Sequence, residues 1–422
     1  MRGSENLLKT SVSTTLLSSA TLAAGLCVCV TSHAQSTPQQ KPEEIETLYI
    51  SDQYSYDDNL FRLSESADLS DPLNAGIVSR DDYVNRLTAG IGEDIELGRQ
   101  VFTVQARAQD VRFSENDHLD HVAGNGKVGW DWLMTSALSG TLGARYTRSL
   151  ADFANSRGAL KDILETMSYE GNLRYKLGPR WSVFAGGEHT KTEHGLDLRR
   201  ADDFEADTGR AGIQYTTPTH HTFALEYRVI DGQFPNRLLD PASSLQSGDY
   251  EENAALARIG YTLSVHTHLQ AMYGYVERTH DDDPNDEFSG DIWRAEISWQ
   301  PRPKFSTKVA AWRELRAYVD AESDYFISDG ISVTPSWRPL RQLSLSFALA
   351  WEEQEYLGFD PIDPTTVGRV DDVFSGLGTF AYSPTDNLSF ELSYRAFDRS
   401  SNRDIRRYDA EVAGLSFRWR VL

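Results

Sequence analysis

The chain has 422 residues, of which 63 are acidic and 41 are Lys or Arg, giving a formal net charge of −22. This charge argues against a nucleic-acid partner, because binding to phosphates draws on an excess of cations. The length would ordinarily predict two or three soluble domains, but one closed β-barrel accommodates as many residues. The negative mean hydropathy does not exclude a membrane barrel, since only alternate residues of its strands face lipid.

Residues 1–34 predict a signal peptide. Arg2 and Lys9 precede an apolar run over residues 16–30, and a small-x-small cleavage sequence ends at Ala34. The run is short and is broken by Ser, Thr and Gly, which favours a cleaved signal over a membrane-anchoring helix.

Both cysteines of the chain, Cys27 and Cys29, lie inside this predicted signal. The remaining chain therefore excludes disulfides and thiolate metal sites. Residues 35–45 are rich in Gln and Pro and predict a flexible periplasmic arm. The third predicted unit, residues 46–422, is a β-barrel.

The barrel begins with a predicted strand over 46–56, followed by a polar connection over 57–81. Beyond it, apolar and polar residues alternate, as in Phe102, Val104 and Ala106 against Thr103 and Gln105. Alternation at period two predicts strands with one apolar face.

Short turns and long polar connections alternate along the chain. We expect turns at Leu97–Arg99, Met134–Thr135, Gly178–Arg180, Thr217–Thr219, Val265–His266, Pro301–Pro303, Pro339–Leu340 and Pro384–Thr385. The long connections are residues 114–121, 150–164, 193–203, 231–250, 280–288, 319–324, 355–370 and 400–404. Eight hairpins with an opening and a closing strand predict an all-β, transmembrane, antiparallel up-and-down β-barrel of about 18 strands, with short periplasmic turns and long extracellular loops.

The closing strand, predicted over 405–421, fits this pattern less well. Leu415, Phe417 and Trp419 alternate in one phase, whereas Tyr408 and Ala410 lie in the other. We predict a β-bulge near residues 413–414 that reconciles the two phases.

Aromatic residues favour a membrane barrel over a soluble sandwich, a β-propeller or a β-solenoid. They gather near the short turns, as an interfacial girdle requires, at Trp130, Trp132, Trp181, Trp299, Trp337, Trp419, Tyr175, Tyr215, Tyr261 and Tyr382. A propeller needs four short strands per repeat and a solenoid a tighter repeat, whereas the runs here give two long strands.

Charged residues on the polar face of the strands are the candidate site, because charge at the lipid midplane costs about 2–4 kcal/mol. The predicted lumen-lining residues are Arg107, Arg145, Arg174, Arg210, Arg228, Arg258, Arg294, Arg395, Glu170, Glu226, Glu296 and Glu391. They either pair along the wall as a structural ladder or bind carboxylates and hydroxyls of a solute. Because Arg outnumbers Glu among these residues, the sequence favours a lumen that selects anions.

No pattern for catalysis stands out, and we expect neither an enzyme nor a cofactor. His220-His221 and His266-x-His268 are more typical of solvated turns than of metal ligands. Asp281-x-Asp283-x-Asn285 lacks the Gly and Glu of a calcium loop. No metal site is expected.

Residues 54–63, with the sequence YSYDDNLFRL, resemble the start of the putative β-barrel porin type 2 family. The resemblance implies an outer-membrane barrel, commonly encoded with genes for exopolysaccharide synthesis and export, and it brings no ligand-contacting residues with it. The expected function is export of exopolysaccharide; the alternatives are a general or nutrient-uptake porin and a plugged barrel acting as scaffold or adhesin. Expected partners are outer-membrane lipid and lipopolysaccharide, with polysaccharide and other export-machinery proteins.

Overall fold

The computed structural model describes residues 48–70, 74, 76–154, 160–237, 248–280, 287–320, 323–357 and 368–421. The predicted signal peptide over 1–34 and the arm over 35–45 lie outside the described residues. Within the described ranges, no helix combines the length and the apolar character needed to cross a bilayer.

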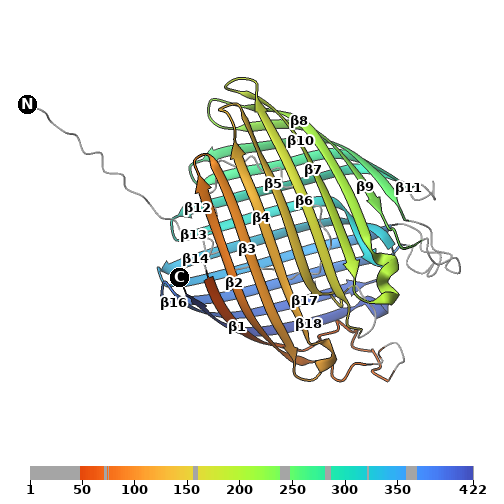
Figure 1. The fold of residues 1–422 in the computed structure, drawn as a ribbon. Helices are drawn as coiled ribbons and strands as arrows, with labels where there is room; N and C mark the ends of the chain where they lie inside the picture. Colours follow the sequence, from red (N-terminus) through yellow and green to blue (C-terminus); the bar gives the residue numbers. More distant parts are fainter. Residues whose placement is uncertain are drawn as a thin grey trace, which may run out of the picture.

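The chain forms one closed, antiparallel sheet of 18 strands (Figure 1). The strands are β1 (Leu48–Asp57), β2 (Asp82–Leu97), β3 (Gln100–Phe113), β4 (His121–Leu133), β5 (Leu138–Leu150), β6 (Ile163–Lys176), β7 (Trp181–His194), β8 (Phe204–Thr216), β9 (Thr222–Gln233), β10 (Tyr250–Ser264), β11 (Thr267–His280), β12 (Phe288–Arg302), β13 (Phe305–Asp320), β14 (Ser323–Leu340), β15 (Leu343–Leu357), β16 (Val370–Thr385), β17 (Leu388–Ser401) and β18 (Tyr408–Arg420). Each strand pairs with its neighbour in sequence, and β1 pairs with both β2 and β18, which closes the cylinder. The predicted up-and-down barrel is confirmed.

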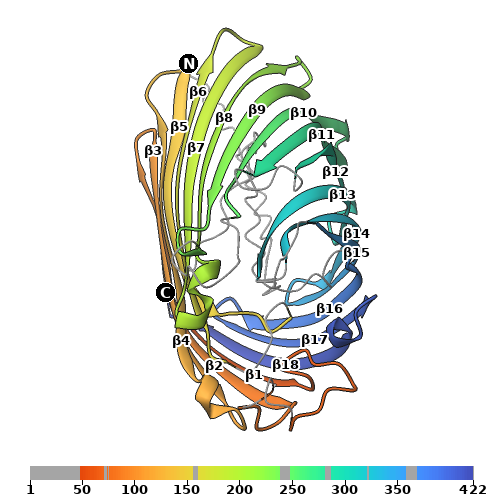
Figure 2. The ribbon, with the colours of Figure 1, turned by 90° about the vertical axis from the view of Figure 1, so that its right-hand side faces the viewer.

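All eight predicted turns lie where one strand of a hairpin ends and the next begins, at one end of the barrel (Figure 1). The β2–β3 turn depends on Gly98, whose φ of 67° is in the left-handed region that other residues adopt at a cost. The long connections lie at the opposite end. Seen from that side, the wall forms an elongated ring (Figure 2).

The two faces of the wall differ in chemistry. The outer face carries exposed apolar side chains such as Leu142, Leu225 and Leu392, as a surface in contact with lipid requires. The predicted girdle aromatics share the outward parity of these residues, and Trp181 and Trp337 are about half exposed near the short-turn end. Inward-facing residues bury small apolar clusters near the other end, including Phe204 with Phe234 and Tyr250.

The bulge predicted near residues 413–414 is wrong. β18 pairs with β17 in one unbroken register, from Leu388 opposite Trp419 to Arg399 opposite Tyr408. Tyr408 and Ala410 are buried because they face inward, below the extracellular connections. The apparent change of phase reflects a barrel interior that is apolar at this end, so alternation in hydrophobicity reverses while the strand does not.

The segment Tyr54–Leu63 closes the barrel where its first and last strands meet. Asp57 forms an ion pair with Arg62 at 2.7 Å. The amide of Asn59 donates hydrogen bonds of 2.8 Å to the carbonyl oxygens of Leu63 and Asp409. Phe61 packs in a buried cluster with Phe153. The motif therefore has a structural role at the seam between β1 and β18.

Replacing Asn59 by Ala should lower the free energy of unfolding by about 2–4 kcal/mol, because buried carbonyl groups lose their donor. Asn59 is 4% exposed. The measurement is the urea midpoint of the detergent-folded barrel, with the folded fraction determined from the mobility of the unheated protein on a gel. Asn74→Ala is the control, since the side-chain amide of Asn74 donates to the carbonyl oxygen of Asp68 within the same connection. Equal midpoints for the two variants would contradict the role of Asn59.

Candidate lumen wall and extracellular rim

The structure places all twelve predicted site residues on the face of the strands opposite the exposed apolar rows. Arg107 lies on β3, Arg145 on β5, Glu170 and Arg174 on β6, Arg210 on β8, Glu226 and Arg228 on β9, Arg258 on β10, Arg294 and Glu296 on β12, and Glu391 and Arg395 on β17. This face is the inner wall of the closed barrel. Their contact with a solute stays a prediction.

Strands β9–β11 carry a ladder of inward ion pairs, in which three arginines share two carboxylates. Arg258 forms an ion pair with Glu226 at 3.0 Å. Glu252 accepts hydrogen bonds from Arg228 at 2.9 Å and from Arg278 at 2.8 Å. The side chains of Glu252 and Arg278 are only 4% and 2% exposed. Such a desolvated charge cluster is tolerable only because its members compensate one another.

Aromatic rings complete the surroundings of Arg278. Its guanidinium carbon lies 4.0 Å from the centre of the Tyr250 ring and 5.2 Å from that of Tyr325. Cation–π contact stabilises a cation most where water is excluded. The charges in this part of the wall are therefore fixed by ion pairs and ring contacts, with three arginines sharing two carboxylates.

Strands β12–β15 continue the matched pattern. Arg294 pairs with Glu314 at 2.9 Å, and Lys308 pairs with Glu296 at 3.0 Å. Arg316 pairs with Glu352 at 3.2 Å. Here the structural-ladder interpretation of the sequence agrees with the geometry.

Strands β3–β5 carry inward cations of a different kind. Arg107, Lys127 and Arg145 lie on three consecutive strands, and Lys127 is directly opposite Arg145. Within the described part of the chain, none of the three forms an ion pair with a carboxylate. The Nε of Arg107 and the Oδ1 of Asn125, its partner in the β3–β4 register, are buried without hydrogen-bond partners there. We refer to Arg107, Lys127 and Arg145 as the cationic patch.

Two further predicted arginines bond only to neutral groups in the described contacts. Arg174 donates to Ser182 at 3.1 Å and to Gln214 at 2.9 Å. Arg210 donates to the side-chain oxygen of Asn172. These contacts orient the guanidinium groups without placing them in ion pairs.

Carboxylates of the same half of the wall lie beside the cationic patch. Glu170 and Glu188 face each other across β6 and β7, and Asp131 shares the inward parity of Lys127 on β4. None of these three forms an ion pair with a patch residue in the described structure. The wall thus combines a ladder of ion pairs on β9–β15 with separated charges on β3–β8.

The sequence analysis did not single out Lys127, Glu188, Glu252, Arg278 or Glu314. The signal was available for Lys127, because Val128, Trp130 and Trp132 alternate with it along β4. For Glu252 and Arg278 the strands carry small or apolar residues on both faces, so period two alone does not assign a face.

At the extracellular rim, His194 joins three connections. Its Nδ1 lies 2.6 Å from a carboxylate oxygen of Asp162, and its backbone N–H donates to Asp203 at 2.7 Å. Asn236 donates to the second oxygen of Asp203 at 2.7 Å. Burial alone would raise the pKa of Asp162, but the hydrogen bond and charge of His194, with the backbone N–H of Leu196, lower it below the usual carboxyl value.

This pKa makes the rim contacts sensitive to acid. Because the pKa of Asp162 is lower in the folded rim than in an unfolded chain, its stabilisation is complete above a pH of about 4 and is lost as pH falls through the lowered pKa. Hydrogen exchange at Leu196, corrected for intrinsic rate, should therefore be slow at pH 6 and become faster as the pH falls through the lowered pKa of Asp162. Asp162→Asn should give fast exchange throughout this range. Unchanged protection in this variant would contradict the role of the carboxylate.

In the described ranges, no group of three or more His, Cys, Asp or Glu side chains is arranged to hold a metal ion. Residues 281–286, which carry the partial calcium-loop sequence, lie outside the described residues.

The barrel was compared with known proteins. Residues 231–421 match the model of the family described as Putative beta-barrel porin 2. No curated protein matches the chain. Among solved structures, a BenF-like porin from Pseudomonas fluorescens Pf-5 is 9% identical with a TM-score of 0.47, covering 90% of this chain and 99% of that chain.

Two porins of Pseudomonas aeruginosa are similar to the same degree. OccK3 (OpdO) is 12% identical with a TM-score of 0.45, covering 88% of this chain and 94% of its own. OpdK is 11% identical with a TM-score of 0.45, covering 89% and 98%. Similarity at this level carries no argument about a solute. The closed 18-stranded barrel, of which residues 231–421 match the Putative beta-barrel porin 2 family model, identifies the chain as a porin-like outer-membrane β-barrel.

Proposed function

We propose that this barrel lets small water-soluble anions cross the outer membrane. The observation that supports it is the cationic patch of Arg107, Lys127 and Arg145, three inward cations without ion pairs in the described structure. Paired charges such as those of β9–β11 give a passing ion little net field. The patch residues are not held in such ion pairs. On β3–β8 the inward cations Arg107, Lys127, Arg145, Arg174 and Arg210 outnumber the inward carboxylates Asp131, Glu170 and Glu188, so this half of the wall attracts anions and repels cations.

The size of the barrel is compatible with transport. An 18-stranded cylinder is too wide for side chains alone to fill. A solute then travels in water along the wall, where an unpaired guanidinium offers a planar fork of donors to a carboxylate or phosphate. The proposed substrates are therefore small carboxylates and phosphorylated compounds.

Swelling of liposomes that contain the purified barrel tests this proposal. Monovalent organic anions should enter faster than neutral solutes of the same size, and organic cations more slowly than both. Faster entry of cations would contradict the proposal, and the absence of swelling with every solute would contradict transport altogether. Liposomes without protein give the baseline.

Export of an acidic exopolysaccharide is the second candidate function. It is supported by the resemblance of Tyr54–Leu63 to a family encoded with exopolysaccharide genes, and by the fit of a chain of carboxylates to the cationic patch. Deletion of the gene should then stop secretion of the polymer while leaving uptake of small anions unchanged. If secretion continues and uptake falls, the barrel serves import.

A further inference from the structure

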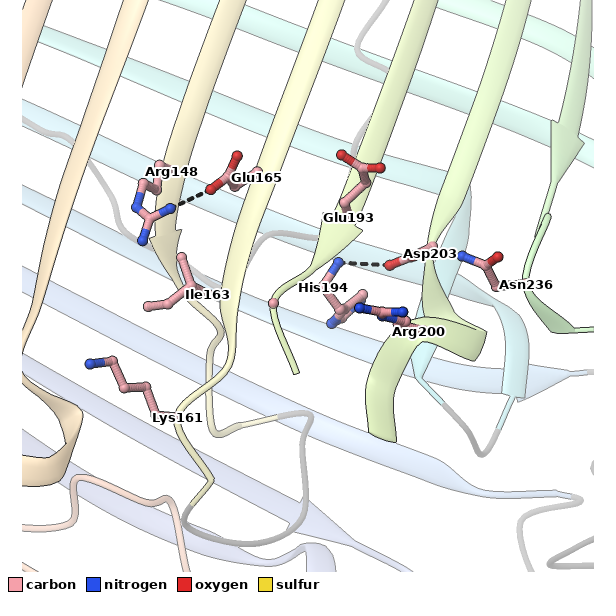
Figure 3. A pocket seen from close by; sticks show the side chains of 10 residues that line it. Arg148, Lys161, Ile163, Glu165, Glu193, His194, Arg200, Asp203 and Asn236 are labelled. Carbon is pink, nitrogen blue, oxygen red and sulfur yellow. Dashed lines mark hydrogen bonds and ion pairs between the residues drawn. The ribbon is translucent and has the colours of Figure 1, made fainter. Parts of the chain in front are cut away.

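A charged cleft lies on the lipid side of the extracellular rim, away from the cationic patch. It has a volume of about 720 Å³ and is formed by the ends of β5, β6 and β7 with the segments that follow and precede them (Figure 3). Arg148, Glu165 and Glu193 contribute from the outward face of these strands, since they share the parity of the exposed residues Leu142, Met167 and Trp181.

The height of this cleft matches the headgroup layer of the outer leaflet. Arg148 follows the first residue of β5, Leu138, by ten residues. At about 3.3 Å per residue this is roughly 33 Å along the strand. With a tilt of about 40°, the rise is about 25 Å, the height of the apolar band of an outer-membrane barrel. Tyr169 and Met167, exposed just below, lie in that band.

The acidic residues of the cleft already have partners. Glu165 forms an ion pair with Arg148, and Glu193 lies 3.3 Å from Lys191. The carboxylate of Asp203 accepts hydrogen bonds at both oxygens, from His194 and Asn236. Glu165 is thus neutralised by Arg148, Glu193 shares Lys191 with Glu205, and Asp203 is bonded by neutral donors.

Two cations of the cleft retain binding capacity. Lys161 donates only to the backbone carbonyl of Asp120 in the described structure. Arg200 pairs with Asp197, but the two side chains are 64% and 83% exposed, so this pair contributes little. Figure 3 shows both on segments separate from Arg148, around the same space. An anion entering the cleft would meet positive charge from three segments.

His194 supplies an independent indication of a ligand. Its side chain is 3% exposed and lines the cleft. Asp162 holds its Nδ1, whereas its Nε2 is buried without a hydrogen-bond partner in the described structure. A buried ring nitrogen without a partner is costly, and a protonated or unprotonated phosphate oxygen would satisfy it.

We infer that this outer cleft binds a phosphate group of a glycolipid in the outer leaflet, through Lys161 and Arg200, with His194 and the Arg148–Glu165 pair beside them. The inference is independent of the proposed transport function. Phosphate is favoured over carboxylate because the cleft offers donors on several sides, and a phosphate has an acceptor oxygen for each. A lipid is favoured over free phosphate because the cleft is on the lipid side, directly above the apolar band.

Native mass spectrometry of the purified full-length barrel tests the inference, using a bisphosphorylated glycolipid, its dephosphorylated form and inorganic phosphate as separate probes. The phosphorylated glycolipid should remain bound and the dephosphorylated form at least about tenfold less, with inorganic phosphate bound weakly. Lys161→Glu with Arg200→Glu should reduce binding by the same factor.

Lys304→Glu with Arg341→Glu is the matched control, because it makes the same change of charge at the short-turn end, where both residues are exposed. This control should bind the glycolipid as the natural chain does. Equal binding of the two glycolipids, or full binding by the Lys161/Arg200 variant, would overturn the inference. Binding of inorganic phosphate as strong as that of the lipid would overturn the assignment to a lipid. Anion conductance should be unchanged in every variant, which separates this test from that of transport.

Discussion

Replacing both Lys127 and Arg145 by Glu should change the barrel from anion-preferring to cation-preferring. A unit charge about 6 Å from an ion in water contributes roughly 0.7 kcal/mol, so the two reversals change the energy of a passing ion by about 3 kcal/mol before screening. Salt with a Debye length of about 10 Å reduces this figure. We therefore expect the ratio of anion to cation permeability to fall about tenfold or more at low salt.

Single-channel recording in a salt gradient measures this ratio. Lys127→Arg with Arg145→Lys is the control, because it exchanges the side chains and keeps both charges. Arg107 is left unchanged, since its Nε is buried and its replacement could act through folding. If the double Glu variant keeps the anion preference of the control, the cationic patch does not determine selectivity.

Replacing Glu252 by Gln should destabilise the barrel by about 3–5 kcal/mol. The carboxylate of Glu252 bonds both Arg228 and Arg278 inside the wall. Gln removes the negative charge and leaves two closely spaced cations at a site that is almost closed to water. The measurement is the urea midpoint of the detergent-folded barrel. Glu251→Gln is the control, because Glu251 precedes Glu252 on β10 and its side chain is exposed on the outer face.

A second variant keeps this prediction testable if the first one does not fold. Glu252→Gln combined with Arg278→Met removes one charge of each sign and places an apolar chain between Tyr250 and Tyr325. It should recover most of the lost stability, since hydrophobic replacement of buried ion pairs is often neutral. A Glu252→Gln barrel as stable as the Glu251→Gln control would contradict the structural role of the ladder.

The fold could be predicted from sequence because lipid on one side and protein interior on the other impose period two on every strand. The turns were predictable from their own chemistry, since Gly98 and Gly178 lie between strands and adopt positive φ angles that other residues disfavour. The phase of the hydrophobic alternation along β18 was not predictable, because Tyr408 and Ala410 are apolar residues that face inward, below the extracellular connections. An apolar residue indicates a lipid-facing position only where the interior of the barrel is filled with water.

The candidate site was predictable in its members but not in its pairing. Alternation placed Arg107 and Arg258 on the same inner face, yet only the register brings Glu226 within 3.0 Å of Arg258. Among the residues that the structure describes, the same register leaves Arg107 without a carboxylate partner. Pairing depends on which residues of adjacent strands lie side by side, and one residue of shift would change every pair. The contacts of His194 at the rim were hidden for the same reason, since Asp162 and Asp203 come from different connections.

The reversal potential of the unmodified barrel in a planar bilayer, with tenfold different KCl on the two sides, tests the account most directly. K⁺ and Cl⁻ have nearly equal mobility in water, so the sign of the reversal potential shows which ion the charges of the barrel wall favour. The account predicts a potential displaced toward that of chloride, and a larger displacement at low salt. A potential displaced toward that of potassium, or a membrane that carries no current with the folded barrel inserted, would contradict it.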